Sequence, residues 1–377
     1  MEGPAPYGLL ARLREEEPVA WVPAIDGWLV TAHELALDVM RDAETYTVDD
    51  PRFTTGQVVG SSMLSLDGAE HARHRAPFVP PLRLGEVRER LAATVQAEAA
   101  RLVQSLAPAG RGELRRGFAG PLAAAVITRT LGVAPDHEHD VLRWYDAIVT
   151  AVSALSAGQP PGPDAEAAMQ ELRAAVASAL GPGAEPSLLA DAAGAGALSQ
   201  EEVAANAAVV LFGAIETMEG MIASALAHLL TAGTVLTAVR DDAGLLPGVI
   251  DESLRLEPAA AAVDRYATRS TDLGGARIAA GDLVRVSLTA ANRDPSVFAD
   301  PDRFDPQRAN ARRHLAFAAG PHVCIGVHLA RLETHMALGT LLDRLPDLRL
   351  DPAHPSPAAR GLIFRKPPVV YAAWTPN

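Results

Sequence analysis

The 377-residue chain contains a single cysteine, Cys324, so it cannot form an internal disulfide. Because disulfides accumulate in oxidising compartments, a lone thiol favours a reducing one. Lysine is equally scarce: Lys366 is the only one, and the rest of the 33 basic side chains are arginine. A guanidinium can bind a carboxylate through two parallel hydrogen bonds, so these arginines are candidates for defined carboxylate partners.

Acidic residues outnumber basic ones: 46 Asp and Glu against 33 Lys and Arg give a formal net charge of −13. Nucleic acids and anionic membranes require basic surface, so the composition argues against both as partners. The richest apolar segment, residues 203–230, is interrupted by Asn206, Glu216 and Glu219, and no run of about 18 apolar residues could span a bilayer. The N-terminal residues do not resemble a secretory signal. We therefore expect a soluble, cytoplasmic protein.

Hydrophobic residues make up 49% of the chain and charged residues 21%, which is an ordinary globular composition. Apolar residues spaced three or four apart predict helices through most of residues 32–257 and after Cys324. Strands are expected around residues 19–23 and 27–32, within 263–290, and in the tail 360–374. We find no repeat and no internal boundary. The sequence predicts a mainly α fold with a smaller β portion (α+β), in one domain over residues 1–377.

The segment GPHVCIGVHLAR (320–331) raises the question of what Cys324 does. A lone cysteine is often an inert packing residue. Zinc would need more Cys and His ligands than His322 and His328 supply, and a thiol nucleophile would need a histidine brought close by the fold. Haem iron requires only one thiolate. A helix that begins after Gly326 would stabilise that thiolate, but these residues alone leave the alternatives open.

The longer segment FAAGPHVCIGVHLAR resembles the haem-binding segment of the cytochrome P450 family, F-G-x-G-x-H-x-C-x-G followed by a small residue. Ala318 stands where the family has its second-position glycine. The resemblance implies a P450-like fold in which haem b (iron protoporphyrin IX) lies between a long distal helix and the helix after the cysteine loop, with Cys324 as the axial iron ligand. The residues that match in order are Phe317, Gly320, His322, Cys324, Gly326 and Ala330.

Two further segments support the resemblance through folding and cofactor binding. Glu252 and Arg255, three apart in VIDESLRLEP, would ordinarily form a solvated pair. In the family they join an arginine of the P-x-R-F segment, here Arg303, in a buried structural triad. His71 and Arg75 in DGAEHARHR could by themselves form an exposed basic turn. The resemblance makes them partners of the haem propionates, together with Arg265 and His322.

A third segment, VLFGAIETMEGMI (210–222), places Glu216 and Thr217 side by side in an apolar helix. A solvent-facing glutamate next to a helix-bonded threonine is one interpretation. The resemblance implies another, in which Glu216 and Thr217 are the catalytic acid–alcohol pair that relays protons during oxygen activation. Ala214 stands where the family usually has a second glycine.

No flavin or nicotinamide fingerprint and no iron–sulfur cysteine set is present. Electrons would therefore come from a separate ferredoxin or flavodoxin with its reductase, and Arg312, Arg313 and Arg331 are candidates for docking it. The predicted activity is a monooxygenase that hydroxylates or epoxidises a fairly apolar small molecule, free or carrier-protein-bound, in bacterial secondary metabolism or catabolism. The alternatives are oxidative C–C or C–N coupling or desaturation, and a non-catalytic haem sensor or carrier-docking protein.

Overall fold

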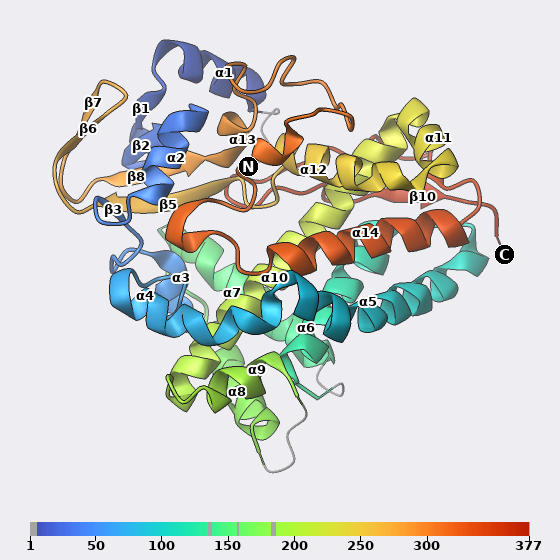
Figure 1. Ribbon diagram of the computed structural model, residues 1–377, viewed down its shortest axis with the longest axis horizontal. Helices are drawn as coiled ribbons and strands as arrows, with labels where there is room; N and C mark the ends of the chain where they lie inside the picture. The colour runs from blue at the N-terminus through green and yellow to red at the C-terminus, as the bar shows by residue number, and fades with distance from the viewer. Residues whose placement is uncertain (1–5, 135–137, 157, 182–185, 377) are drawn as a thin grey trace. The chain divides into compact units, whose positions relative to one another are not determined.

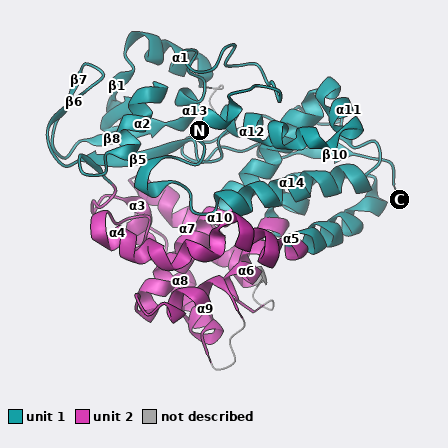
Figure 2. Ribbon diagram, in the orientation of Figure 1, with its two compact units in different colours: residues 1–47, 95–121, 216–377 teal, residues 48–94, 122–215 magenta. Residues whose placement is uncertain are grey.

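The computed structural model describes residues 6–134, 138–156, 158–181 and 186–376, and Figure 1 shows that helices make up most of the described chain. The chain divides into two compact units, coloured separately in Figure 2. Unit 1 comprises Met1–Thr47, Val95–Pro121 and Glu216–Asn377, and unit 2 comprises Val48–Thr94 and Leu122–Ile215. The expectation of one domain over residues 1–377 stays a prediction.

Unit 1 contains a five-stranded sheet in the order β1-β2-β8-β5-β3. Strands β2 and β8 are parallel, with Trp28 opposite Val284, and the other neighbours are antiparallel. The strands predicted near residues 19–23, 27–32 and 263–290 are therefore present. The strands are β1 (Val19–Val22), β2 (Gly27–Val30), β3 (Tyr46–Thr47), β5 (Ala262–Ala267) and β8 (Leu283–Ser287).

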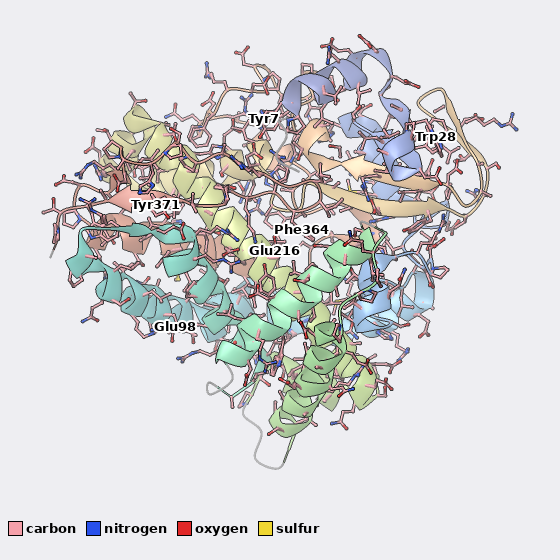
Figure 3. The ribbon with its side chains drawn as sticks, turned by 180° about the vertical axis from the view of Figure 1, so that it is seen from behind. Tyr7, Trp28, Glu98, Glu216, Phe364 and Tyr371 are labelled. Carbon is pink, nitrogen blue, oxygen red and sulfur yellow. The ribbon has the colours of Figure 1, made fainter. Side chains whose placement is uncertain are left out.

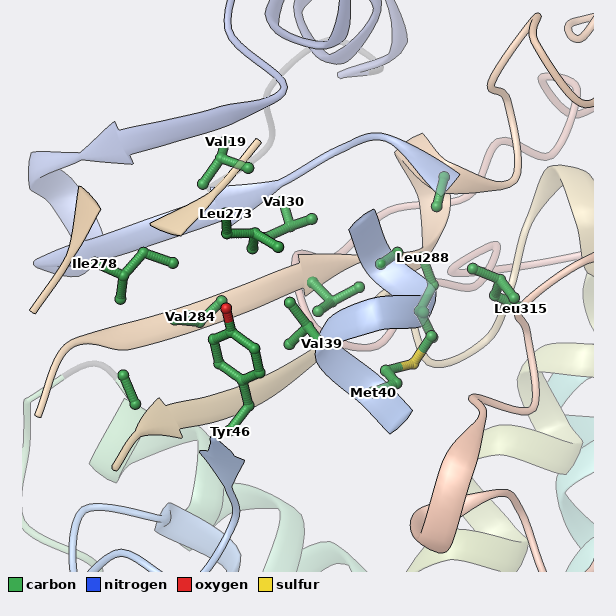
Figure 4. Close-up of a cluster of buried hydrophobic side chains, with 14 residues drawn as sticks. Val19, Val30, Val39, Met40, Tyr46, Leu273, Ile278, Val284, Leu288 and Leu315 are labelled. Atoms are coloured by element: carbon green, nitrogen blue, oxygen red, sulfur yellow. The ribbon is translucent and has the colours of Figure 1, made fainter. Parts of the chain in front are cut away.

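The core beneath this sheet consists of branched aliphatic side chains from the strands and from α2 (His33–Arg41). Val30, Val284 and Val286 are fully buried, and Val39 and Met40 of α2 pack against them (Figure 4). Burying side chains of this size stabilises the fold by about 1.5–3 kcal/mol each. Leu315 belongs to this cluster, and Ala318 and Ala319 pack against it, so the cluster supports the segment that leads into the cysteine loop.

The remaining strands of unit 1 are short. A three-stranded sheet runs β4-β10-β9, and β6 pairs with β7 in a hairpin. The tail predicted as a strand over residues 360–374 is regular only in β10, while Phe364 and Lys366 form isolated bridges. Pro367 and Pro368 explain the interruption, because proline cannot donate a ladder hydrogen bond. The bounds are β4 (Arg111–Glu113), β6 (Thr271–Leu273), β7 (Ala276–Ile278), β9 (Arg349–Leu350) and β10 (Tyr371–Ala373).

The helices of unit 1 carry most of the candidate site. In α14, Leu338 and Leu341 lie on the buried face at helical spacing. Besides α2, these helices are α1 (Tyr7–Glu16), α11 (Gly233–Asp241), α12 (Leu246–Leu256), α13 (Leu288–Ala291) and α14 (Val327–Arg344).

Unit 2 is helical. Trp144 and Ile148 of α7 are buried, as is Leu172 of α8, the helix that packs against α7. Its helices are α3 (Thr54–Val59), α4 (Gly68–Arg75), α7 (Glu138–Ser156), α8 (Asp164–Ala179) and α9 (Leu188–Gly194).

Three helices contribute residues to both units: α5 (Leu84–Leu106), α6 (Gly120–Leu131) and α10 (Gln200–Thr231). Within the described residues, α10 alone is long and apolar enough to cross a membrane, and 78% of its most apolar window is buried inside the protein. Such burial is typical of a central core helix. Asn206, Glu216 and Glu219 are buried on this helix, whereas Glu201 in its first turn is exposed.

Candidate active site

Cys324 lies in a tight loop immediately before α14. Its backbone N–H donates to the carbonyl of Phe317 at 2.8 Å, which closes the loop. Gly326 is the N-cap of the 18-residue helix, and a Cβ added there would stand 4.0 Å from the Cys324 sulfur. The cysteine is exposed, so the interpretation as an inert core thiol is wrong. A thiol at this position experiences the partial positive charge of the helix N-terminus, which favours the thiolate.

The loop also depends on two residues with positive φ. Gly320 has φ 72°, and an added Cβ would lie 2.2 Å from the Met40 carbonyl oxygen, so only glycine fits. Ala318 has φ 57°, in the left-handed region that an alanine rarely adopts. The residue that departs from the family pattern is thus held in the conformation that glycine would adopt freely. The backbone is strained at Ala318, yet the loop still closes through the Cys324–Phe317 hydrogen bond.

The surroundings of Cys324 decide which metal chemistry fits. Among the described residues, no group of three or more His, Cys, Asp or Glu side chains could hold a metal ion. The structure therefore gives the zinc alternative no support. An exposed single thiol at a helix N-terminus fits haem iron, which takes one thiolate from the protein.

The predicted propionate partners occur in both units. Arg265 on β5 is buried and donates from Nη1 to the Asp264 carbonyl at 2.8 Å. His322 is half-buried in the turn before Cys324. Both belong to unit 1, whereas His71 and Arg75 lie on α4 in unit 2. Their role toward the propionates stays a prediction.

Phe317 has defined neighbours in the cysteine loop. The Arg331 guanidinium carbon lies 5.1 Å from the centre of its ring, and the His314 ring lies 5.8 Å from it. Arg331 in turn binds Asp251 at 2.8 Å, and Arg312 binds the same carboxylate at 3.1 Å. Two of the three arginines suggested for partner docking therefore have a carboxylate partner within the protein.

Asp251 and His314 show how burial and charge compete in this cluster. Burial raises the pKa of Asp251, but the nearby His314 ring and the Arg331 charge outweigh it, so its pKa lies below the usual range. Burial dominates for His314, and its pKa is lowered despite the nearby carboxylate. Asp251 immediately precedes Glu252 on α12. The helix is therefore tied by Arg312 and Arg331 to the segments on either side of the cysteine loop.

Glu216, labelled in Figure 3, is buried on α10, and Lys366 Nζ lies 2.8 Å from its Oε1. The interpretation of Glu216 as a solvent-facing residue is therefore wrong. Thr217 is half-buried beside it. A buried acid adjacent to an alcohol on a core helix suits proton transfer.

Glu219 is a neighbour whose importance the sequence does not reveal. It is fully buried, and its Oε2 accepts from Arg115 Nη2 at 3.1 Å and from Lys366 Nζ at 2.7 Å. In the sequence, Glu219 stands out only as an interruption of the apolar run. The available signal is its spacing from Glu216, because residues three apart share a helix face.

The buried triad on α12 differs from the prediction in one member. Arg255 binds both oxygens of Glu252 at 2.8 Å, and both side chains are fully buried. The third member is Arg308, whose Nε lies 3.0 Å from Glu252 Oε1. The prediction of Arg303 is wrong: its guanidinium binds Asp305 and is 66% exposed. The chain turns at Asp305, whose N–H donates to Glu252, and this turn presents Arg308.

Glu333 on α14 is a second buried acid that the sequence reasoning missed. Burial raises the pKa of Glu333 to about 8. Its Oε1 has no hydrogen-bond partner within the part of the chain that the structure describes. A carboxyl in this environment holds its proton at neutral pH.

These features agree with the comparisons to known proteins. The family model described as Cytochrome P450 matches residues 184–368. The 20-oxo-5-O-mycaminosyltylactone 23-monooxygenase of Streptomyces fradiae is 34% identical over 381 residues, covering 97% of this chain and 87% of that protein. The chain belongs to the cytochrome P450 family. The P450 monooxygenase PikC of Streptomyces venezuelae is 36% identical to this P450, with 95% of the chain and 89% of the relative covered.

Solved structures give the same result for the fold. This P450 matches the crystal structure of CalO2 with a TM-score of 0.89 and 26% identity, over 98% of this chain and 96% of that one. P450BioI, solved in complex with a fatty-acid-ligated acyl carrier protein, matches with a TM-score of 0.88 and 26% identity, over 98% of both chains. The predicted mainly α, P450-like fold is confirmed. The protein is a haem-iron monooxygenase, an oxidoreductase that acts on small organic molecules.

Proposed function

We propose that this P450 hydroxylates or epoxidises a fairly apolar small molecule in bacterial secondary metabolism. The observation that carries the proposal is the exposed lone thiol of Cys324 at the N-terminus of α14. The named relatives support it, since they include the 20-oxo-5-O-mycaminosyltylactone 23-monooxygenase and a nocardicin C N-oxygenase. The acyl carrier protein complex of P450BioI supports a carrier-bound substrate as one form of delivery.

The cofactor assignment rests on the chemistry of the donors. We assign haem b as the cofactor: the Cys324 thiolate would hold its iron, and Phe317 and Gly326 would shape the loop around that sulfur. The anionic propionates require cations or N–H donors when they are buried. We assign that role to His71, Arg75, Arg265 and His322.

In the proposed mechanism, the thiolate-ligated haem supplies oxygen activation when it is bound. The protein's own contribution is proton delivery and positioning. Glu216 would relay each proton, taking it up from solvent on one side and passing it on toward the Thr217 hydroxyl, which orients it. Glu216 is buried on α10, so it lies between solvent and the interior of the protein. Substrate orientation then determines which carbon is oxidised.

We further propose that electrons come from a separate ferredoxin or flavodoxin with its reductase, in the cytoplasm. Arg312 is 75% exposed although it binds Asp251, and Arg313 is exposed beside it. An acidic partner would be attracted to this pair of guanidinium groups. Arg331 is mainly committed to Asp251 and contributes less.

The decisive experiment is the spectrum of the reduced protein under carbon monoxide. We expect a strongly red-shifted Soret band, which a thiolate ligand produces, and its complete loss in Cys324→Ala. His328→Ala is the matched control, because His328 lies on α14 close to the loop but has no assigned role. Persistence of the red-shifted band in Cys324→Ala would refute the ligand assignment. Ligand-induced spin-state shifts in the same spectrum then identify substrates.

A further inference from the structure

Two buried glutamates on α10 converge on the only lysine of the chain. Lys366 Nζ lies 2.8 Å from Glu216 Oε1 and 2.7 Å from Glu219 Oε2. The side chains of the two acids are 7% and 0% exposed, and that of the lysine is 14% exposed. Two carboxylates one helical turn apart repel each other at low dielectric, so a shared cation stabilises both. Lys366 is placed where it can act on both acids.

The backbone fixes where Lys366 lies. Its N–H donates to the Arg360 carbonyl at 3.1 Å, and the Arg360 N–H donates back at 3.0 Å. Gly220 permits this tail to approach α10, because an added Cβ would lie 3.1 Å from the Ala259 Cβ and 3.4 Å from the Lys366 Cβ. The two backbone hydrogen bonds between Arg360 and Lys366 therefore fix the position from which the Lys366 side chain extends toward α10.

Arg115 holds the other end of the cluster. Its Nη2 donates to Glu219 at 3.1 Å, and its Nη1 donates to the Pro368 carbonyl at 2.7 Å, so one guanidinium binds both α10 and the tail. Gly120 leaves room for the acid, since an added Cβ would be 2.9 Å from Glu219 Oε1. The contacts form a continuous series: Arg115, Glu219, Lys366, Glu216.

We propose that Lys366 is the positioning residue for Glu216, and that Glu219 and Arg115 hold Lys366 in place. The ammonium binds Oε1 of Glu216, which fixes the plane of the carboxyl group and the direction of its second oxygen. Thr217 follows Glu216 directly in the chain. The direction of the second Glu216 oxygen therefore determines how the carboxyl group is oriented for proton transfer toward the Thr217 hydroxyl. Glu219 acts through Lys366 and takes no proton itself. The inference rests on the proposed relay role of Glu216.

A single lysine allows the contact to be observed directly. Protein labelled with [¹³Cε]lysine gives one side-chain NMR signal, recorded in the reduced, carbon-monoxide-bound holoenzyme, which is diamagnetic. We expect Glu216→Gln and Glu219→Gln each to move this signal, because each removes a carboxylate in contact with Nζ. Glu16→Gln, which neutralises an exposed acid on α1, should leave the signal in place. If Glu216→Gln does not move it, the Lys366–Glu216 contact is overturned.

Activity then tests the consequence of the contact. The readout is product formed per reducing equivalent consumed, and Glu216→Gln and Thr217→Ala are measured first. Unchanged coupling in both variants refutes the relay itself, and with it the proposed function of Glu216. Given a relay, Lys366→Met should lower coupling by about tenfold, because the acid loses its alignment.

Two further variants separate positioning from a purely structural role. Lys366→Arg should recover part of the coupling, since a cation again faces both acids, and Glu216→Gln/Lys366→Met should lose no more than Glu216→Gln alone. Arg349→Met, which removes an exposed cation on β9, is the control for net charge. Full coupling in Lys366→Met, with an impaired Glu216→Gln, overturns the proposal and leaves the relay intact. If Lys366→Met does not fold, Lys366→Arg and the NMR signal still decide it.

Discussion

Unit 1 contains two buried ion clusters that treat their carboxylates differently. Glu252 on α12 accepts hydrogen bonds on both oxygens, from Arg255, Arg308 and the Asp305 N–H. On α10, Glu219 accepts hydrogen bonds at Oε2, whereas its Oε1 has, among the described residues, only an ion pair, with Arg116 Nε at 3.4 Å. The oxygens of Glu252 are thus held by several donors at once, whereas Glu216 and Glu219 share one ammonium, so the position of each acid depends on the other. We expect the α12 cluster to contribute to folding and the α10 cluster to contribute to proton transfer.

The largest effect expected from this difference is on stability. Arg255→Met leaves Glu252 charged and fully buried without its bidentate partner, which should cost about 3–5 kcal/mol in the free energy of unfolding. Arg308→Met should cost less, because Arg255 still binds both oxygens. Arg303→Met is the matched control, since its exposed pair with Asp305 contributes at most about 1 kcal/mol. Chemical denaturation measures all three, and an Arg303→Met as damaging as Arg308→Met would restore Arg303 to the triad.

Glu333 adds a third way of burying a carboxyl, which is to keep its proton. Its pKa of about 8 in the folded state lies above the unfolded value near 4.5. The folded protein thus binds the proton more tightly, and this contribution is complete below about pH 4.5 and is lost as pH rises toward 8. The loss should be on the order of a few kcal/mol.

Glu333→Gln tests this case, because glutamine is neutral at every pH. The difference in unfolding free energy between the variant and the wild type should increase in the variant's favour from pH 5 to pH 9. Glu16→Gln, at an exposed position on α1, should show no such trend. If the difference in unfolding free energy stays constant from pH 5 to pH 9, Glu333 is charged and paired with a cation, as Glu252 is on α12.

The sequence predicts the local parts of these clusters and misses the long-range ones. The pairing of Glu252 with Arg255 follows from a spacing of three on a helix, and the resemblance of the loop segment to the haem-binding segment of the family points to Cys324. Arg308 is missed because a turn at Asp305 decides which arginine returns to α12. Lys366 and Glu219 are 147 positions apart, so no periodicity could join them. What the sequence does not show is the packing of the tail against α10.

The smallest expected effect concerns the cysteine loop, where the relevant energy comes from backbone strain and not from a buried charge. Ala318 adopts φ 57°, which costs an L-residue roughly 1–2 kcal/mol relative to glycine. Ala318→Gly removes this cost but adds about 0.4–1 kcal/mol of unfolded-chain entropy, so the net gain in stability should lie between zero and about 1.6 kcal/mol. Ala319→Gly is the matched control, because Ala319 has φ −149° and gains no relief. In thermal unfolding experiments, Ala318→Gly should therefore raise Tm, and Ala319→Gly should lower it slightly. Equal losses in both variants would show that the loop carries no strain at Ala318, and that its geometry comes from Gly320 and the Phe317–Cys324 hydrogen bond alone.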